Sequence, residues 1–307
     1  MASKDANGIR LEYESIGEAG APPVLLIMGL GCQLITWPEE FCEGLRGRGL
    51  RLIRFDNRDA GMSGKCEGLQ HTSLSRSLFA HLLGRAFKPA YTLEDMADDS
   101  VALLDALEIE SAHVVGASMG GMIGQIMAIR HGHRLRSLTS IMSTTGNPDL
   151  PQASLKVRLM MARPRPGTHT PESAKEYSYR LWRTIGSPEY PVEEARLREL
   201  IERGYQRSYY PSGVARQLLA VMAAPCRVDV LRQLEIPTLV IHGNDDPLVP
   251  VAAGKDTAEA IPGARLKIYP GMGHDFPVEL LGEMAGLIAE HIEQVEQDST
   301  PLRSLAI

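Results

Sequence analysis

The sequence contains few cysteines, and their spacing excludes two common uses of this residue. Cys32, Cys42, Cys66 and Cys226 are the four cysteines of the 307-residue chain, and no two of them form a CxxC pair. This spacing fits neither a zinc site nor the disulfide framework of a small secreted protein. We therefore expect reduced thiols, and a chain of this length can bury a core without disulfides.

An excess of basic residues is also absent. The chain has 32 Lys and Arg residues against 38 Asp and Glu residues, which gives a net charge of −6, and the arginines are spread along the sequence. Proteins that neutralise phosphates need a basic stripe or patch. Nucleic acid is therefore not an expected partner.

Long apolar runs are missing as well. Residues 1–10 include Lys4 and Asp5 and lack the apolar stretch of a signal peptide, and runs such as Val24–Met28 are too short to span a membrane. With 44% apolar and 23% charged residues, the composition is that of an ordinary globular protein. We expect a cytoplasmic protein with no membrane insertion.

Short apolar runs alternate with segments of helical spacing along most of the chain. The predicted strands are Ile9–Glu14, which is exposed and antiparallel, and then Val24–Met28, Leu50–Phe55, His113–Gly116, Leu138–Met142, Pro237–His242 and Arg265–Tyr269. The predicted helices are Trp37–Leu50, Leu93–Leu107 with Thr92 as its N-cap, and Met119–His131. Continuous apolar runs are typical of parallel strands covered on both faces. The pattern predicts an α/β fold with a mostly parallel central sheet and helices on both faces.

This alternation stops once, between about Gly146 and Arg227. Prolines are frequent in this stretch, and Ser173–Thr184 and Val192–Tyr205 have helical spacing. The sequence therefore predicts a helical cap over residues 147–226, inserted into a core formed by residues 1–146 and 227–297. Residues 298–307 are expected to form a C-terminal tail.

A G-x-S-x-G motif stands where a predicted buried strand meets a predicted helix. Gly116-Ala117-Ser118-Met119-Gly120 is the motif, and this context is the one that a nucleophile elbow requires. A serine on so sharp a turn is strained, and bulky residues two positions away on either side would collide across it. The alternative is an ordinary glycine-rich junction between a strand and a helix.

Two further candidates follow Ser118 in the chain order that this kind of site needs. Asp246 comes just after the strand that ends at His242, and His274 lies in a glycine-rich loop after the last predicted strand. Ligands and catalytic groups gather at the carboxyl ends of strands in an open α/β sheet. Asp245 is an alternative acid, but Pro247 steers Asp246 toward an extended backbone, which favours Asp246.

Backbone amides that could stabilise an oxyanion are expected from two places. Gly29 and Leu30 directly follow the first buried strand, and Met119 follows the candidate nucleophile. The N–H groups of Leu30 and Met119 are the predicted oxyanion donors. An ordinary turn after the strand is the alternative interpretation of the first segment.

These residues together resemble the α/β-hydrolase superfamily over nearly the whole chain. The resemblance is strongest over residues 23–64, 111–142 and 237–277, and the acid loop from Ile241 to Pro250 places the acid three residues after its glycine, at Asp246. Met28 stands where many members have a histidine, and Asp59 replaces the usual glycine after Arg58. Both departures are similar to the aclacinomycin methylesterase type of bacterial hydrolase, which implies a carboxylic ester hydrolase but not its particular substrate.

The predicted reaction is ester hydrolysis by a serine esterase of the Ser-His-Asp kind. Ser118 would attack the ester carbonyl, His274 would move the proton, and Asp246 would orient His274, with neither a metal nor an organic cofactor. Other enzymes that use this machinery remain alternatives: lactonases, amidases or aminopeptidases, perhydrolases and carbon–carbon bond hydrolases. A slow-turnover small-molecule receptor of the same fold is a different class that also remains open.

Methionines and aromatic residues are the candidate walls of an apolar pocket. They are Met28, Trp37 and Phe276 from the predicted core, and Met160, Met161, Trp182, Tyr209, Tyr210 and Met222 from the predicted cap, and Gly29 beside Met28 is a further candidate. Plain core packing is the alternative for each of them. The expected partner is a small-molecule ester, and the sequence leaves a homodimer open.

Overall fold

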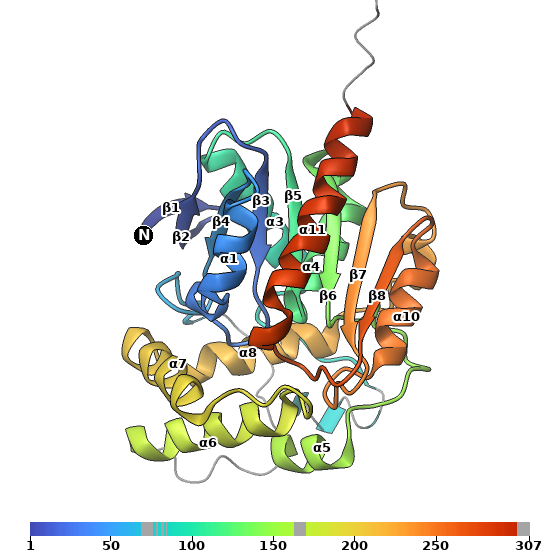
Figure 1. Ribbon diagram of the computed structural model, residues 1–307. Coiled ribbons are helices and arrows are strands. Elements are labelled where there is room, and N and C mark those ends of the chain that lie inside the picture. The colour runs from blue at the N-terminus through green and yellow to red at the C-terminus, as the bar shows by residue number, and fades with distance from the viewer. Residues whose placement is uncertain (69–75, 78, 81–82, 84, 163–169, 300–307) are drawn as a thin grey trace, which may run out of the picture.

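A single mixed sheet forms the centre of the computed structural model, which describes residues 1–68, 76–77, 79–80, 83, 85–162 and 170–299 (Figure 1). Within these residues eight strands pair in the order β1-β2-β4-β3-β5-β6-β7-β8. The strands are β1 (Ala2–Ala6), β2 (Ile9–Ile16), β3 (Pro23–Ile27), β4 (Arg51–Phe55), β5 (Ala112–Ala117), β6 (Leu135–Ile141), β7 (Thr238–Gly243) and β8 (Arg265–Tyr269). Strands β1 and β2 are antiparallel to their neighbours and the remaining pairs are parallel, which confirms the predicted fold class.

Apolar side chains of the central strands point alternately into two separate cores. In β3, Val24 and Leu26 belong to a core with Phe41 and Met284, whereas Leu25 and Ile27 belong to a core with Ile123. The first core lies under α1 (Glu39–Arg46) and α11 (Val278–Ser299), and the second under α3 (Leu93–Ala106) and α4 (Met119–His131). Both faces of the sheet are therefore covered, which is why β3 is apolar along its whole length.

Local signals set several helix boundaries. The side chain of Thr92 accepts a hydrogen bond from the Asp95 N–H while Asp95 bonds back to Thr92, a capping box that confirms the predicted start of α3. Helix α4 spans the predicted residues, and α10 (Val251–Ala260) packs against β7 and β8. The helix predicted over Trp37–Leu50 is shorter, because α1 begins only after Pro38 and the 3-10 turn η1 (Leu34–Thr36) precedes it.

Helices also occupy the stretch between β6 and β7, as the sequence predicted. They are α5 (Leu155–Ala162), α6 (Pro171–Ile185), α7 (Glu194–Arg207), α8 (Pro211–Ala223) and the short α9 (Val228–Leu231). We call α5–α8 the cap helices, and Figure 1 shows them below the carboxyl ends of the parallel strands. The stretch begins and ends at neighbouring points, since the Arg227 N–H donates to the Thr145 carbonyl at 2.9 Å. The residue limits of the cap, 147–226, remain a prediction.

Some elements differ from the sequence-based expectation. Strand β6 starts at Leu135, and α11 continues to Ser299, so Asp298 belongs to this helix instead of a tail. Residues 300–307 lie outside the described residues. The prediction missed β1, α5, α8, α9 and α10, and for α8 the reason is that Pro211 stands at its first turn, where proline starts a helix instead of breaking one.

Candidate active site

Ser118 lies on a strained turn between β5 and α4. Its backbone has φ 55° and ψ −118°, a region that residues other than glycine rarely adopt, and its N–H donates to the Ile141 carbonyl at 2.9 Å. A Cβ added to Gly116 would collide with the Gly120 carbonyl, and one added to Gly120 would collide with the Ile27 carbonyl. Both glycines of the motif are therefore required by close backbone approach, as the sequence argument expected.

Side chains from three strand ends meet at this turn. His274 Nε2 lies 3.0 Å from Ser118 Oγ, and His274 Nδ1 lies 2.6 Å from Asp246 Oδ2. Asp246 and His274 are both about 6% exposed, so the contact between them is shielded from water. The structure thus brings together the three side chains that the sequence singled out, in the order Ser118, His274, Asp246.

The two adjacent aspartates of the acid loop face different partners. The second oxygen of Asp246, Oδ1, accepts hydrogen bonds from the Leu248 and Val249 N–H groups, both at 2.8 Å. Asp245 instead accepts from the Gly271 N–H at 3.0 Å and has no contact with His274 among the interactions of the described residues. The geometry therefore places Asp246, and not Asp245, against the imidazole.

Two backbone amides near the serine come from separate elements. Gly29 packs so closely on Ser118 that a Cβ added to Gly29 would lie 3.2 Å from the Ser118 Cβ, and Leu30 follows it in the same loop. The N–H groups of Leu30 and Met119 donate to no acceptor within the described part of the chain. They are the two positions predicted as oxyanion donors.

Comparison with known proteins identifies the family at this point. The family model described as alpha/beta hydrolase fold matches residues 22–279. The chain belongs to the α/β-hydrolase fold family. Two relatives match over almost the full length of both chains: rhodomycin D methylesterase DauP of Streptomyces sp. (strain C5), 29% identical over 95% of this chain and 97% of DauP, and DnrP of Streptomyces peucetius, 28% identical over 92% and 95%. The resemblance to methylesterases of this type is therefore confirmed.

A solved structure supports the fold of this α/β hydrolase. The meta-cleavage product hydrolase CumD from Pseudomonas fluorescens IP01 superposes with a TM-score of 0.74 and 21% identity, over 96% of this chain and 98% of CumD. At this level of identity the likeness concerns the fold alone.

The cap helix α8 holds the loop after β3, which carries the predicted oxyanion donor Leu30, and the sequence did not predict this contact. Buried Gln217 accepts from the Gly31 N–H at 2.8 Å and donates to the Arg58 carbonyl at 2.8 Å. Its side-chain amide therefore fixes the peptide that follows Leu30. Gln217 is far from Gly31 in sequence, so only the fold brings the two together.

Arg216, beside Gln217, forms a buried ion pair with Asp59. The guanidinium donates to both carboxylate oxygens at 2.8 Å, and the Tyr91 hydroxyl and the Cys66 N–H donate to the same carboxylate. Burial alone would raise the pKa of Asp59, but these hydrogen bonds outweigh it and hold the pKa below its ordinary value. Asp59 has a φ of 67°, which explains why a glycine is usual at this position.

The end of α6 holds the loop that carries His274. The His274 N–H donates to the Ile185 carbonyl at 2.8 Å, and the Gly273 N–H donates to Ser187 Oγ at 2.8 Å. Ser187 in turn donates to Asp275, whose burial raises the pKa of its carboxyl group. Cap helices therefore contact both the loop after β3, which carries Leu30, and the loop that carries His274.

The candidate pocket residues divide between the core and the cap. Trp37 is fully buried and stacks on Phe41 at 5.5 Å between ring centroids, with Phe276 at 5.3 Å, so it packs as a core residue. Met28 is buried in the same core. The Tyr210 hydroxyl bonds to Glu67 and Arg216, and this tyrosine links the cap to the core.

The remaining candidates from the cap differ in how far their side chains are buried. Met160, Trp182 and Met222 are half-buried, and Tyr209 is 39% exposed. The Met161 side chain lies outside the described residues.

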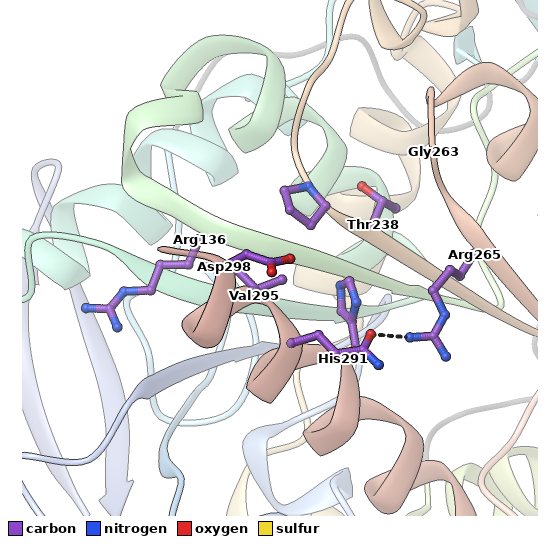
Figure 2. Close-up of a pocket in the computed structure, with 9 residues that line it drawn as sticks. Arg136, Thr238, Gly263, Arg265, His291, Val295 and Asp298 are labelled. Atoms are coloured by element: carbon purple, nitrogen blue, oxygen red, sulfur yellow. Dashed lines mark hydrogen bonds between the residues drawn. The ribbon is translucent and has the colours of Figure 1, made fainter. Parts of the chain in front are cut away.

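A surface cavity of about 320 Å³ lies elsewhere (Figure 2). Its lining includes Thr238 and Arg265 at the starts of β7 and β8, together with His291 and Asp298 of α11. The starts of these strands are the edge opposite Ser118, so the cavity is not part of the candidate active site. Among the described residues no group of three or more His, Cys, Asp or Glu side chains is arranged to hold a metal ion.

Proposed function

We propose that this chain is a serine esterase that hydrolyses an apolar small-molecule carboxylic ester through an acyl-enzyme. The observation that carries the proposal is the continuous chain of contacts from Ser118 Oγ to His274 Nε2 at 3.0 Å and from His274 Nδ1 to Asp246 at 2.6 Å. This arrangement matches the roles of nucleophile, base and orienting acid.

The first half-reaction forms the acyl-enzyme. Asp246 accepts the Nδ1–H of His274, which leaves Nε2 free to take the Ser118 hydroxyl proton as Oγ attacks the ester carbonyl. Negative charge then develops on the carbonyl oxygen, and the Leu30 and Met119 N–H groups donate to it. The tetrahedral adduct collapses, and the leaving alcohol takes the proton from Nε2.

The second half-reaction restores the enzyme. His274 removes a proton from a water molecule, the resulting hydroxide attacks the acyl-serine, and the same two N–H groups stabilise the second oxyanion. Collapse releases the carboxylic acid and returns the proton to Ser118 Oγ. Every proton moves between Ser118, His274 and the substrate or water, so these residues complete the cycle without a cofactor.

The relatives favour an ester over the other substrates of this fold. DauP and DnrP, both described as methylesterases, align with nearly the whole chain, including the cap helices. The other hydrolase classes have weaker support, because 2-hydroxymuconate semialdehyde hydrolase of Pseudomonas sp. (strain CF600) is 29% identical over only 69% of this chain, and the likeness to CumD is a likeness of fold. A methyl or other small alkyl ester of an apolar acid is therefore the substrate class to test first.

The test compares purified wild type with Ser118→Ala on a panel of esters, lactones and amides. We expect turnover of at least one ester by the wild type and a loss on the order of 10⁴-fold or more in Ser118→Ala. Ser100→Ala is the matched control, because Ser100 is a buried serine on α3 whose hydroxyl bonds only to the Met96 carbonyl. Single-turnover release by the wild type would assign the chain to the receptor class instead.

A further inference from the structure

Helix α5 presents an apolar face to solvent. Leu155 and Leu159 are one helical turn apart, and their side chains are 69% and 54% exposed. Val157, on the opposite side of the helix, is fully buried against the protein. A single exposed leucine needs no explanation, but here two share one face of a cap helix while the other face makes the packing contact.

Positive charges flank this apolar face. Lys156 and Arg158 are both exposed, and helical geometry places them about 80° to either side of the Leu155–Leu159 line. An apolar face bordered by lysine and arginine is the arrangement of helices that lie in the interface of an anionic membrane.

The charge distribution along the chain supports the same interpretation. Between Asp149 and Glu172, and again between Glu67 and Glu94, the sequence has no acidic residue but has seven Lys or Arg residues. Since the whole chain has 32 basic and 38 acidic residues, the other segments hold 25 basic against 38 acidic ones. Two short segments are therefore basic in a chain that is otherwise acidic.

The second basic segment also exposes large apolar side chains. Phe79 is 64% exposed and Leu83 is 51% exposed, and Arg76 and Arg85 beside them are exposed as well. In Figure 1 the cyan ribbon of residues 76–77 and 79–80 lies at the same lower end of the molecule as α5. Apolar and basic side chains from both segments thus occur at the end of the molecule that carries the cap helices.

This end is also the end of the candidate active site. The Ser154 N–H, just before α5, donates to the Pro247 carbonyl at 2.8 Å, and Pro247 directly follows Asp246. We infer that α5, with the exposed residues Phe79 and Leu83, docks on the surface of an anionic phospholipid bilayer. The contact is peripheral, since no helix in the described ranges is long and apolar enough to cross a bilayer.

A second copy of the chain fits this surface less well than a bilayer does. A two-fold dimer would place the same patch against itself, so Lys156 and Arg158 would face the lysines and arginines of the other copy. Anionic headgroups would neutralise these cations while Leu155 and Leu159 enter the headgroup region. Charge complementarity therefore decides in favour of lipid.

The test is co-sedimentation of the full-length protein with vesicles of phosphatidylcholine alone and with one quarter phosphatidylglycerol. We expect binding to the anionic vesicles, little binding to the neutral ones, and weaker binding as salt rises. Leu155→Ser/Leu159→Ser and Lys156→Glu/Arg158→Glu should each weaken binding about tenfold or more. Lys4→Glu/Lys255→Glu makes the same change in net charge at exposed sites outside the patch and should bind like wild type.

Circular dichroism and hydrolysis of a water-soluble ester check that each variant is folded, and neither readout depends on lipid. Absence of wild-type binding to the anionic vesicles would overturn the inference, as would equal binding by all variants. A dimer that the leucine variant abolishes, without vesicle binding, would assign the surface to a second copy and also contradict it. If the wild-type protein hydrolyses no ester, the proposed function is contradicted, and the vesicle result is unaffected.

Discussion

Ser118 is held in a backbone conformation that a serine on its own would avoid. The cost of a positive φ at a residue other than glycine is on the order of 1–3 kcal/mol, and it persists only where the surroundings fix it. Here β5 and α4 fix the turn from both sides, and Gly116 and Gly120 leave room for it. The strain presents Oγ to His274, as a nucleophile would require.

At this scale the sequence predicted the residues whose signals are local. The glycines near Ser118 and the proline after Asp246 act on the backbone close to these two residues, so a short stretch of sequence is enough to predict their effect. Gln217 and the Asp59–Arg216 pair carry no such signal, because their partners are more than 150 residues away. Asp59 was noticed only as a departure from the family pattern, and its role depends on Arg216.

The acid assignment gives the sharpest prediction for single residues. Asp246→Asn keeps an oxygen for the Leu248 and Val249 amides but turns an NH₂ group toward His274 Nδ1, which favours the wrong imidazole tautomer. We expect kcat to fall roughly 10³- to 10⁴-fold. Asp245→Asn loses at most the bond to the Gly271 amide and should stay within about tenfold.

Steady-state kinetics on one ester, with thermal unfolding as the check on folding, separates the two variants. If Asp245→Asn suffers the large loss and Asp246→Asn the small one, the acid is Asp245. Mild losses in both would point to a different carboxylate.

Among the elements, α8 connects the cap to the core. It carries Arg216 and Gln217, which bind the loop after β4 and the loop after β3. The strands that bear these loops were predicted correctly, because each contains a short run of buried apolar residues, as strands of a covered parallel sheet do. The helix itself was missed, because a proline such as Pro211 can either begin a helix or end one, depending on its position.

The ion pair between α8 and the core predicts a pH-dependent stability. Arg216→Met leaves the carboxylate of Asp59 buried without its cation, and we expect about 3–5 kcal/mol of destabilisation at pH 7. Because the pKa of folded Asp59 is below its ordinary value, the stability from this pair is present above the unfolded pKa of about 3.9 and is lost as pH falls through the folded pKa. In the variant, burial without the cation raises the pKa of Asp59, so the difference between the variant and wild type should shrink as pH falls from that raised pKa to the folded pKa of wild type.

Urea unfolding at several pH values measures this effect. The double variant Asp59→Asn/Arg216→Met is the control, because it removes both charges, keeps an acceptor oxygen for the Tyr91 hydroxyl or the Cys66 N–H, and places a residue that tolerates a positive φ. It should recover much of the stability that Arg216→Met loses. A double variant as unstable as the single one would show that the pair is not the cause.

At the scale of the whole molecule, the described cap helices contact the sheet at the edge where the parallel strands end. The parallel strands bring Ser118, Asp246 and His274 to their carboxyl ends, while α6 and α8 hold the loops beside them. The order of strands and helices predicted this edge, because parallel strands must end on the same side. The way the cap contacts it could not be predicted, since those contacts join side chains and loops that are distant in sequence.

The central claim is that Ser118 is the nucleophile of an ester hydrolase, and covalent labelling tests it most directly. The wild type is incubated with a fluorophosphonate, digested, and mapped by mass spectrometry, with residual ester hydrolysis measured in parallel. The account predicts one adduct per chain, on Ser118, with activity lost in proportion to labelling and no adduct in Ser118→Ala. An adduct on another serine that accompanies the loss of activity, or full activity with Ser118 labelled, would contradict it.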